Sequence, residues 1–243
     1  MKSVLQLGSI ELGPVPRLAA ILEHPMDDAA LLNLARRGAT VLEIRIDSFD
    51  STGQGLAYLK ELKSRFGQQF GLLATCRETE ETRPDRAAVF QAAAGIAHAI
   101  DIEFESPDRE ALVQMGHAAG CRVFLSSHNF EKTPAQNELL RILEESRRLN
   151  CEACKIAVYA NDMRDMQRLS HFLLTHFDDH LITIAMGPNG LSSRIMHPVL
   201  GSLVSYGYLE KPNAPGQLSL DELHETMMKF HPGYAQDYAN RFP

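Results

Sequence analysis

The chain has 243 residues, of which 44% are hydrophobic and 23% charged, enough for one large domain or two small ones with a sizeable core. Its net charge of -7 and isoelectric point of about 5.8 argue against nucleic acid as the main partner, although a local basic pocket for an anion remains open. Residues 1–8 lack the apolar core of a signal peptide, and no apolar run is long enough to cross a membrane. We therefore expect a cytoplasmic protein without a membrane partner.

Short apolar runs, rich in β-branched or aromatic residues, alternate with amphipathic stretches along the whole chain. Ser106 and Thr133 each stand before a proline, as at helix starts, and Gly38 and Gly120 suit helix ends. In chain order, the expected strands are Arg17–Leu22, Thr40–Ile46, Phe70–Cys76, Ala99–Phe104, Arg122–Ser127, Ala153–Tyr159, Leu181–Ala185 and Leu203–Tyr206. The expected helices are Asp27–Arg37, Leu56–Phe66, Asp85–His98, Asp108–Ala119, Gln136–Leu149 and Asp162–His176.

This alternation gives about eight βα units, which predicts an α/β fold of the (β/α)8 TIM-barrel type in a single domain over residues 1–243. No linker, low-complexity segment or block of charge divides the chain. A doubly wound open sheet is the alternative, because it has the same alternation. Polar residues gather at the carboxyl ends of the strands, and no dinucleotide or P-loop glycine motif is present, so the sequence favours the barrel.

Lys155 is the only charged residue in the apolar run 153–159, which predicts a buried strand. Burial disfavours an ammonium group and lowers the pKa of a lysine from about 10.4 toward neutrality. The neutral amine can attack a carbonyl carbon and form a Schiff base. Another predicted strand ends at His128, which suits proton transfer near neutral pH, although a structural histidine is the alternative. Together the two residues predict imine-forming enzyme chemistry.

Charged residues also interrupt the second predicted strand. Because strand side chains alternate between faces, Glu43, Arg45 and Asp47 share one face and would point into a barrel or above its mouth. Three such charges are costly unless they pair with each other, as a structural network, or bind a ligand. Further charges within or just after strands are Arg77, Asp101 and Glu103. The pattern predicts a cavity for a polyhydroxylated, negatively charged small molecule.

Two loops near the carboxyl end of the chain suit ligand binding. Residues 186–194 carry glycines and hydroxyls that could present backbone N–H groups to an anion, with Arg194 as a carboxylate clamp. The same segment also suits a helix cap. Residues 213–217 could close over the cavity, or form a turn without a role.

The sequence shows no convincing metal site. Cys151 and Cys154 form a C-x-x-C, but a zinc ribbon needs a second close pair, and none is present. No histidines make an H-x-x-x-H pair suited to binding a metal. We expect the two cysteines to be reduced structural thiols.

In combination these pieces resemble type I 3-dehydroquinate dehydratase, the Schiff-base enzyme family of the shikimate pathway, from about Arg17 to Leu220. The pieces that carry the resemblance are Glu43-Ile44-Arg45-Ile46-Asp47, Thr75-Cys76-Arg77 with Glu81, Asp101-Ile102-Glu103, Ser127-His128-Asn129-Phe130 with Thr133-Pro134, Lys155-Ile156-Ala157, Met186-Gly187, Ser193-Arg194 and Ala214-Pro215-Gly216-Gln217. The resemblance implies a homodimeric barrel that needs no cofactor or metal. It also implies dehydration of 3-dehydroquinate to 3-dehydroshikimate in aromatic amino acid biosynthesis.

The resemblance assigns three catalytic roles. Lys155 would form the imine with the ring ketone. His128 would remove a proton from the neighbouring carbon and return it to the departing hydroxyl, and Glu81 would orient His128. Arg194 would hold the substrate carboxylate. The other substrate-binding positions are Glu43, Arg45, Arg77, Met186, Tyr206, Asn213 and Gln217.

The chain departs from residues that are usual in the family, and two other functions remain open. The departures are Asn129 in place of Asp, Asn213 in place of Ser, and Tyr159-Ala160 in place of Met-Pro. Tyr206 stands where the family has an aromatic residue that is often Phe. A class I aldolase or transaldolase would also use a barrel lysine. A non-catalytic sensor that binds quinate-like metabolites would not need an imine-forming lysine.

Overall fold

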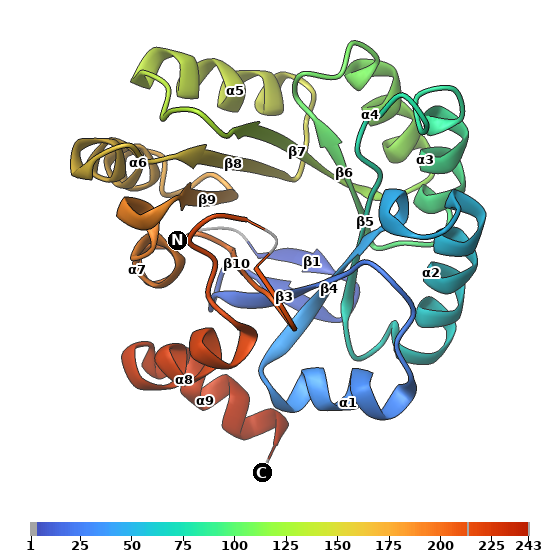
Figure 1. The fold of residues 1–243 in the computed structure, drawn as a ribbon, viewed down its shortest axis with the longest axis horizontal. Helices are drawn as coiled ribbons and strands as arrows, with labels where there is room; N and C mark the ends of the chain where they lie inside the picture. The colour runs from blue at the N-terminus through green and yellow to red at the C-terminus, as the bar shows by residue number, and fades with distance from the viewer. Residues whose placement is uncertain (1–3, 213, 243) are drawn as a thin grey trace.

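The structure is a computed structural model, and it describes residues 4–212 and 214–242 (Figure 1). Eight parallel strands lie in the order β10-β3-β4-β5-β6-β7-β8-β9. The barrel is nearly closed, because the backbone N–H of Leu203 donates to the carbonyl of Leu181 (2.9 Å) and so joins β10 to β9. These strands are β3 (Arg17–Leu22), β4 (Ala39–Arg45), β5 (Gly71–Thr75), β6 (Ala99–Glu103), β7 (Arg122–Asn129), β8 (Ala153–Tyr159), β9 (Leu181–Met186) and β10 (Val204–Gly207).

Helices cover the outside of the barrel (Figure 1). Several begin at a side-chain cap: Asp27 accepts a hydrogen bond from the backbone N–H of Ala30, and Ser51 from that of Gln54. The helices are α1 (Asp28–Arg36), α2 (Thr52–Phe66), α3 (Arg86–Ala94), α4 (Arg109–Ala118), α5 (Gln136–Arg148), α6 (Met163–Thr175), α7 (Ser193–Val199), α8 (Leu220–Phe230) and α9 (Pro232–Arg241), with short 3-10 turns η1 (Ile46–Ser48) and η2 (Pro188–Gly190). No helix in the described part of the chain is long and apolar enough to cross a membrane.

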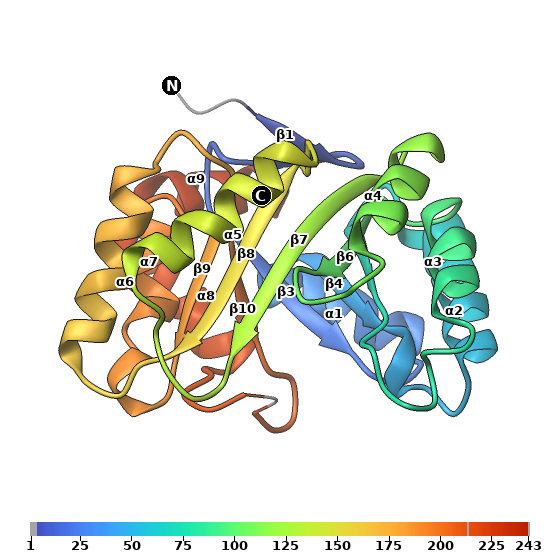
Figure 2. The same ribbon diagram turned by 90° about the horizontal axis from the view of Figure 1, so that it is seen from above.

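The inside of the barrel has an apolar floor. The first inward side chains of the strands pack with the antiparallel hairpin of β1 (Leu5–Leu7) and β2 (Ile10–Leu12). Leu7 and Leu12 are fully buried there. Figure 2 shows β1 beside the amino ends of the strands, opposite the end to which the arrows point. With this floor filled, the space at the carboxyl ends of the strands is left for polar side chains.

The structure confirms the barrel over the open sheet, and all eight predicted strands are present with ends shifted by at most two residues. Three features were not predicted: the β1–β2 hairpin, helix α7 and helix α8. The helix predicted over Asp85–His98 is shorter, because α3 ends at Ala94 with Gly95 as its cap residue.

Candidate active site

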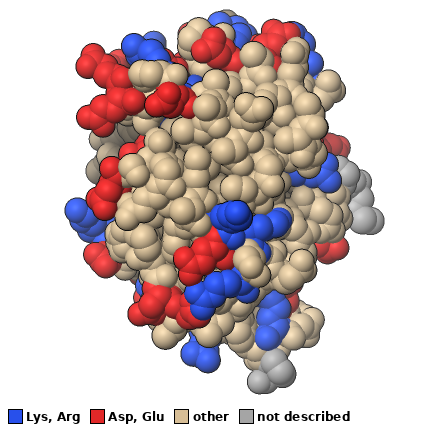
Figure 3. Space-filling view, turned by 90° about the vertical axis from the view of Figure 1, so that its right-hand side faces the viewer, with Lys and Arg blue, Asp and Glu red and all other residues tan. Residues whose placement is uncertain are grey.

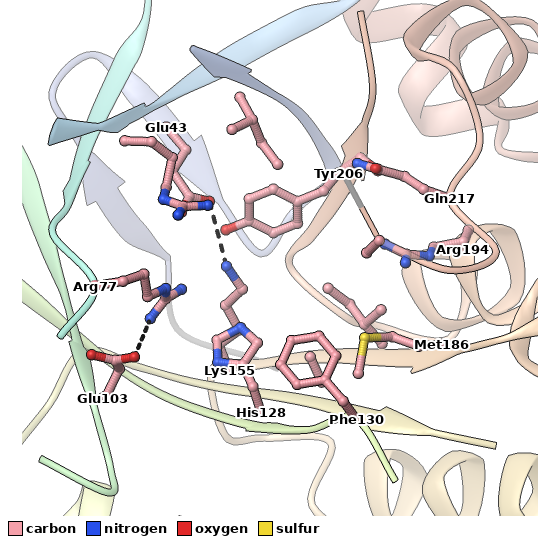
Figure 4. A pocket seen from close by; sticks show the side chains of 15 residues that line it. Glu43, Arg77, Glu103, His128, Phe130, Lys155, Met186, Arg194, Tyr206 and Gln217 are labelled. Atoms are coloured by element: carbon pink, nitrogen blue, oxygen red, sulfur yellow. Dashed lines mark hydrogen bonds and ion pairs between the residues drawn. The ribbon is translucent and has the colours of Figure 1, made fainter. Parts of the chain in front are cut away.

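A cavity of about 340 Å³ opens at the carboxyl ends of the barrel strands (Figure 4). Nine positions predicted as catalytic or substrate-binding lie on its wall. The lining residues are Ile21, Glu43, Arg45, Arg77, Glu103, His128, Phe130, Lys155, Ala157, Ile184, Met186, Arg194, Tyr206, Ala214 and Gln217.

Lys155 lies in the middle of β8, and its side chain is only 6% exposed. Its Nζ is 3.4 Å from Oε2 of Glu43 on β4 and 3.7 Å from Oδ2 of Asp101 on β6. The same Nζ lies 4.1 Å from the centre of the Tyr206 ring. The amine therefore faces the cavity with two carboxylates beside it and an aromatic wall over it. The small side chain of Ala157, one step further along the same face of the strand, leaves room for a substrate.

A network of buried charges fixes the side chain of Arg77 on the wall of the cavity. Nη1 of Arg77 lies 3.1 Å from Oδ1 of Asp101 and 3.2 Å from the hydroxyl of Ser126, which itself donates to the same carboxylate oxygen (2.5 Å). Burial works against both charges, but Arg77 and Lys155 hold the pKa of Asp101 below its usual range. Asp101 and Glu43 in turn raise the pKa of Arg77 above its ordinary value, although desolvation opposes them. Both groups are therefore charged near neutral pH.

Two residues of the charged triplet predicted on β4 contribute to the cavity and one supports them. Glu43 and Arg45 line it, and Glu43 accepts a hydrogen bond from the hydroxyl of Thr75 (2.8 Å). Asp47 lies in η1 and pairs with Arg45 at 2.6 Å. The triplet therefore combines the two readings left open by the sequence, a ligand site and a structural ion pair.

His128 lies near the end of β7, next to β8, with its ring stacked at 6.2 Å on Phe130. Burial, followed by the charges of Arg77 and Lys155, lowers its pKa to about 3. The ring is therefore neutral at neutral pH, which a general base requires. Asp101 opposes this shift, since its carboxylate favours a proton on the imidazole.

Arg194 forms the opposite wall of the cavity. It is the second residue of α7, whose first residue, Ser193, accepts a hydrogen bond from the backbone N–H of Ala185 at the end of β9 (2.9 Å). Burial lowers the pKa of Arg194 to about 10. Its Nε and Nη2 are buried without a hydrogen-bond partner among the described residues, an arrangement that a bound carboxylate would satisfy.

The loop before α8 packs over the cavity. The amide of Gln217 donates to the carbonyl of Tyr206 (3.3 Å), and the backbone N–H of Gly187 donates to the carbonyl of Pro215 (3.1 Å). Gly216 has a φ of +67°, and a Cβ there would lie 2.6 Å from the carbonyl oxygen of Gly187. Only glycine fits this close approach. Asn213, predicted to bind substrate, lies outside the described residues.

The structure does not bring Glu81 into the cavity. Its side chain is exposed on the loop between β5 and α3, and it is absent from the lining residues. Asp101, by contrast, is a buried carboxylate whose charge raises the pKa of His128. Glu103 and Phe130 line the cavity but were not among the predicted binding residues. The sequence pattern had named Glu103 among the charges expected at the cavity, without a binding role, whereas Phe130 lies just past the end of β7, where strand alternation no longer applies.

The described residues include no group of three or more His, Cys, Asp or Glu side chains placed to hold a metal ion. Cys151 and Cys154 are free thiols at the amino end of β8. Burial raises the pKa of Cys151 to about 12, which leaves it protonated and unreactive.

A model of the type I 3-dehydroquinase family matches residues 22–232. The 3-dehydroquinate dehydratase of Aquifex aeolicus is 34% identical over 222 residues, covering 87% of this chain and 99% of that protein. That of Klebsiella pneumoniae strain 342 is 33% identical over 231 residues, covering 88% and 90%. The solved type I enzyme of Clostridium difficile, with covalent modified comenic acid, has a TM-score of 0.82 and 25% identity over 96% of this chain and 99% of its own. The chain therefore belongs to the type I 3-dehydroquinase family.

Proposed function

We propose that this chain converts 3-dehydroquinate to 3-dehydroshikimate through an imine on Lys155, as a hydro-lyase of aromatic amino acid biosynthesis. The observation that carries the proposal is the buried amine of Lys155 on the cavity wall, with two carboxylates beside it and His128 on the neighbouring strand. Dehydration next to a ketone needs such a pair: a nucleophile that turns the ketone into an electron sink and a base for the adjacent C–H.

The reaction begins when the neutral amine of Lys155 attacks the ring ketone and the resulting carbinolamine loses water. Because the nucleophile must be the free amine, the ammonium proton has to leave first. We assign this proton to His128, whose strand lies beside that of Lys155. The protonated imine that follows withdraws electrons from the adjacent carbon, while Glu43 and Asp101 balance its positive charge.

His128 then acts twice in the elimination. It removes the proton from the carbon next to the imine, and the C–H electrons form an enamine. The enamine expels the tertiary hydroxyl, which leaves as water with the proton from the imidazolium. Asp101 stabilises that transient imidazolium, since its charge favours protonation of His128. Water finally hydrolyses the imine and regenerates Lys155.

The remaining lining residues hold the substrate. Arg194 takes the carboxylate with its unpartnered nitrogens, and Glu43, Arg45 and Arg77 take the ring hydroxyls. Met186, Tyr206 and Gln217 complete the wall. The resemblance adds Asn213 to this set, and the role it gives Glu81 requires that carboxylate to reach His128 from its exposed position.

Turnover of 3-dehydroquinate by the purified protein, followed by the ultraviolet absorbance of the conjugated product, tests the proposal. Replacing Arg194 with Met should raise KM about 100-fold, because a charged, paired hydrogen bond to the carboxylate is lost. Arg122→Met, at the opposite end of the barrel on an exposed side chain, is the matched control. An aldolase would cleave a C–C bond and release two products, and a sensor would bind the substrate without turnover. Either result contradicts the proposal.

We also propose that the chain acts as a cytoplasmic homodimer without a nucleic-acid partner. Large apolar side chains are exposed around α6 and α7, namely Leu174, Phe177, Met196 and Val199. A second copy of the chain would bury them. A light-scattering mass of twice 27.0 kDa supports the dimer, and a mass of 27.0 kDa at all concentrations contradicts it.

The surface charge supports the proposal that nucleic acid is not a partner. Figure 3 shows both signs of charge interspersed on the side that carries α2 and α3, rather than a continuous basic surface.

A further inference from the structure

The cavity wall has a weak seam between β5 and β6. The two strands pair only from Leu73–Ala99 to Thr75–Asp101, three positions, which makes this the shortest of the seven parallel ladders in the described barrel. Beyond that point no strand ladder joins them. Arg77 and Glu103, which lie past the end of the ladder, nevertheless both line the cavity.

Arg86, the first residue of α3, bridges this seam with one guanidinium group. Its Nε donates to the carbonyl of Cys76 (2.9 Å), the residue directly before Arg77. Its Nη1 donates to the hydroxyl of Ser106 (3.0 Å), and its Nη2 to Oε2 of Glu103 (2.7 Å). Only 5% of the residue is exposed, and it is absent from the residues that line the cavity.

Glu103 passes this restraint on to the cavity. Its Oε2 is held by Arg86, and its Oε1 lies 3.6 Å from Nη1 of Arg77 (Figure 4). Arg77 in turn contacts Asp101, which lies beside Lys155. Arg86 therefore restrains Arg77 twice: through the carbonyl that precedes it in the chain and through the carboxylate that faces its side chain.

We propose that Arg86 is a positioning residue, which fixes the guanidinium of Arg77 toward the substrate hydroxyls by bridging the ends of β5 and β6. This inference rests on the proposed function, because it needs Arg77 to hold substrate. Guanidinium suits the task, since its fork of donors reaches three acceptors at fixed angles and a lysine amine cannot. Loss of Arg86 removes the donor to the carbonyl of Cys76 and the stronger of two donors to Oε2 of Glu103, which keeps only the backbone N–H of Glu78 (3.3 Å). Arg77 then keeps its contacts with Asp101 and Ser126, and its carbonyl still accepts from Thr82 (2.7 Å).

The test is the kinetics of Arg86→Met with 3-dehydroquinate. We expect KM to rise about tenfold and kcat to change less than about threefold, as for loss of a group that orients a binding residue. Arg86→Lys, which retains the charge but not the planar fork of donors, should recover part of the loss and carries the same test if the Met variant does not fold. Arg83→Met is the matched control, because Arg83 lies three residues before Arg86 on the loop that leads into α3, is 65% exposed, and pairs with Glu78 (3.0 Å), whose other carboxylate oxygen lies 3.6 Å from Arg86. It should keep the wild-type KM.

A double-mutant cycle separates positioning from general stabilisation. In an Arg77→Met background the Arg86 substitution should change KM less than about twofold, because the residue that it positions is gone. In an Arg194→Met background the tenfold effect should persist, since Arg194 is on another wall. Equal effects of the Arg86 substitution in the wild-type and Arg77→Met backgrounds would overturn the inference and leave the proposed function intact. A wild-type KM for Arg77→Met would overturn both the role of Arg77 and the inference built on it.

Discussion

Lys155 should stabilise the fold as well as act in catalysis, and Lys155→Met tests this. Methionine has a similar length but no charge, so the substitution leaves two buried carboxylates without their shared cation. Glu43 and Asp101 have side chains only 3% and 0% exposed. Removing one partner of a buried ion pair typically costs 3–5 kcal/mol.

The structure places the expected cost at the low end of that range. Asp101 keeps its contacts with Arg77 and Ser126, and Glu43 keeps its hydrogen bond from Thr75. We therefore expect a loss of about 3 kcal/mol, and a Tm lower by about 6 to 12 °C for a chain of this size. Since domains are typically stable by about 5–15 kcal/mol, the variant should still fold.

Calorimetric melting at neutral pH is the assay, with Lys60→Met as the control, because Lys60 is an exposed lysine of α2. Adding Glu43→Gln to Lys155→Met should return about 1–2 kcal/mol, since it removes the carboxylate left unpaired. The reasoning is refuted if Lys155→Met has the same Tm as the Lys60→Met control, or if the double variant is no more stable than Lys155→Met alone.

Three further predictions follow from the surroundings of His128. His128→Ala should still form some imine but should lower turnover about 10² to 10⁴-fold. Turnover near the wild-type rate in this variant would contradict the acid–base role of His128. Because its folded pKa is lowered to about 3, below the unfolded value of about 6.5, the stability from its neutral ring is complete above pH 6.5 and is lost as pH falls toward 3. Between pH 6.5 and 4, denaturant titrations should show wild type losing about 3 kcal/mol more than His128→Asn. Finally, Asp101→Asn should lower kcat at least about 100-fold and Glu81→Gln should lower it less than about threefold, because of these two carboxylates only Asp101 is buried beside His128. A larger effect of Glu81→Gln would favour Glu81 as the group that orients His128.

The sequence predicted the barrel and most of the cavity because both depend on local patterns. Each strand is a short apolar run, and its inward side chains alternate, so a charge such as Glu43 or Lys155 near the carboxyl end must face the same space. The parallel order of the strands then brings together residues that are far apart in the chain.

The features that were missed depend on tertiary contacts. The strands of the β1–β2 hairpin have three residues each, too few to show a periodic pattern, and they are stable because Leu7 and Leu12 fill the barrel floor. The path of the loop that carries Glu81 is not encoded by any periodicity. Arg86, at the start of a helix, has the sequence signature of a surface residue, and only the three acceptors around it reveal its burial.

The measurement that tests the account most directly is the mass of the protein after incubation with 3-dehydroquinate and borohydride, followed by peptide mapping. Borohydride reduces an imine to a stable amine, so the account predicts one ligand-sized adduct on the peptide that contains Lys155, and none in Lys155→Ala. A folded protein without an adduct, or an adduct that persists in Lys155→Ala, would contradict it.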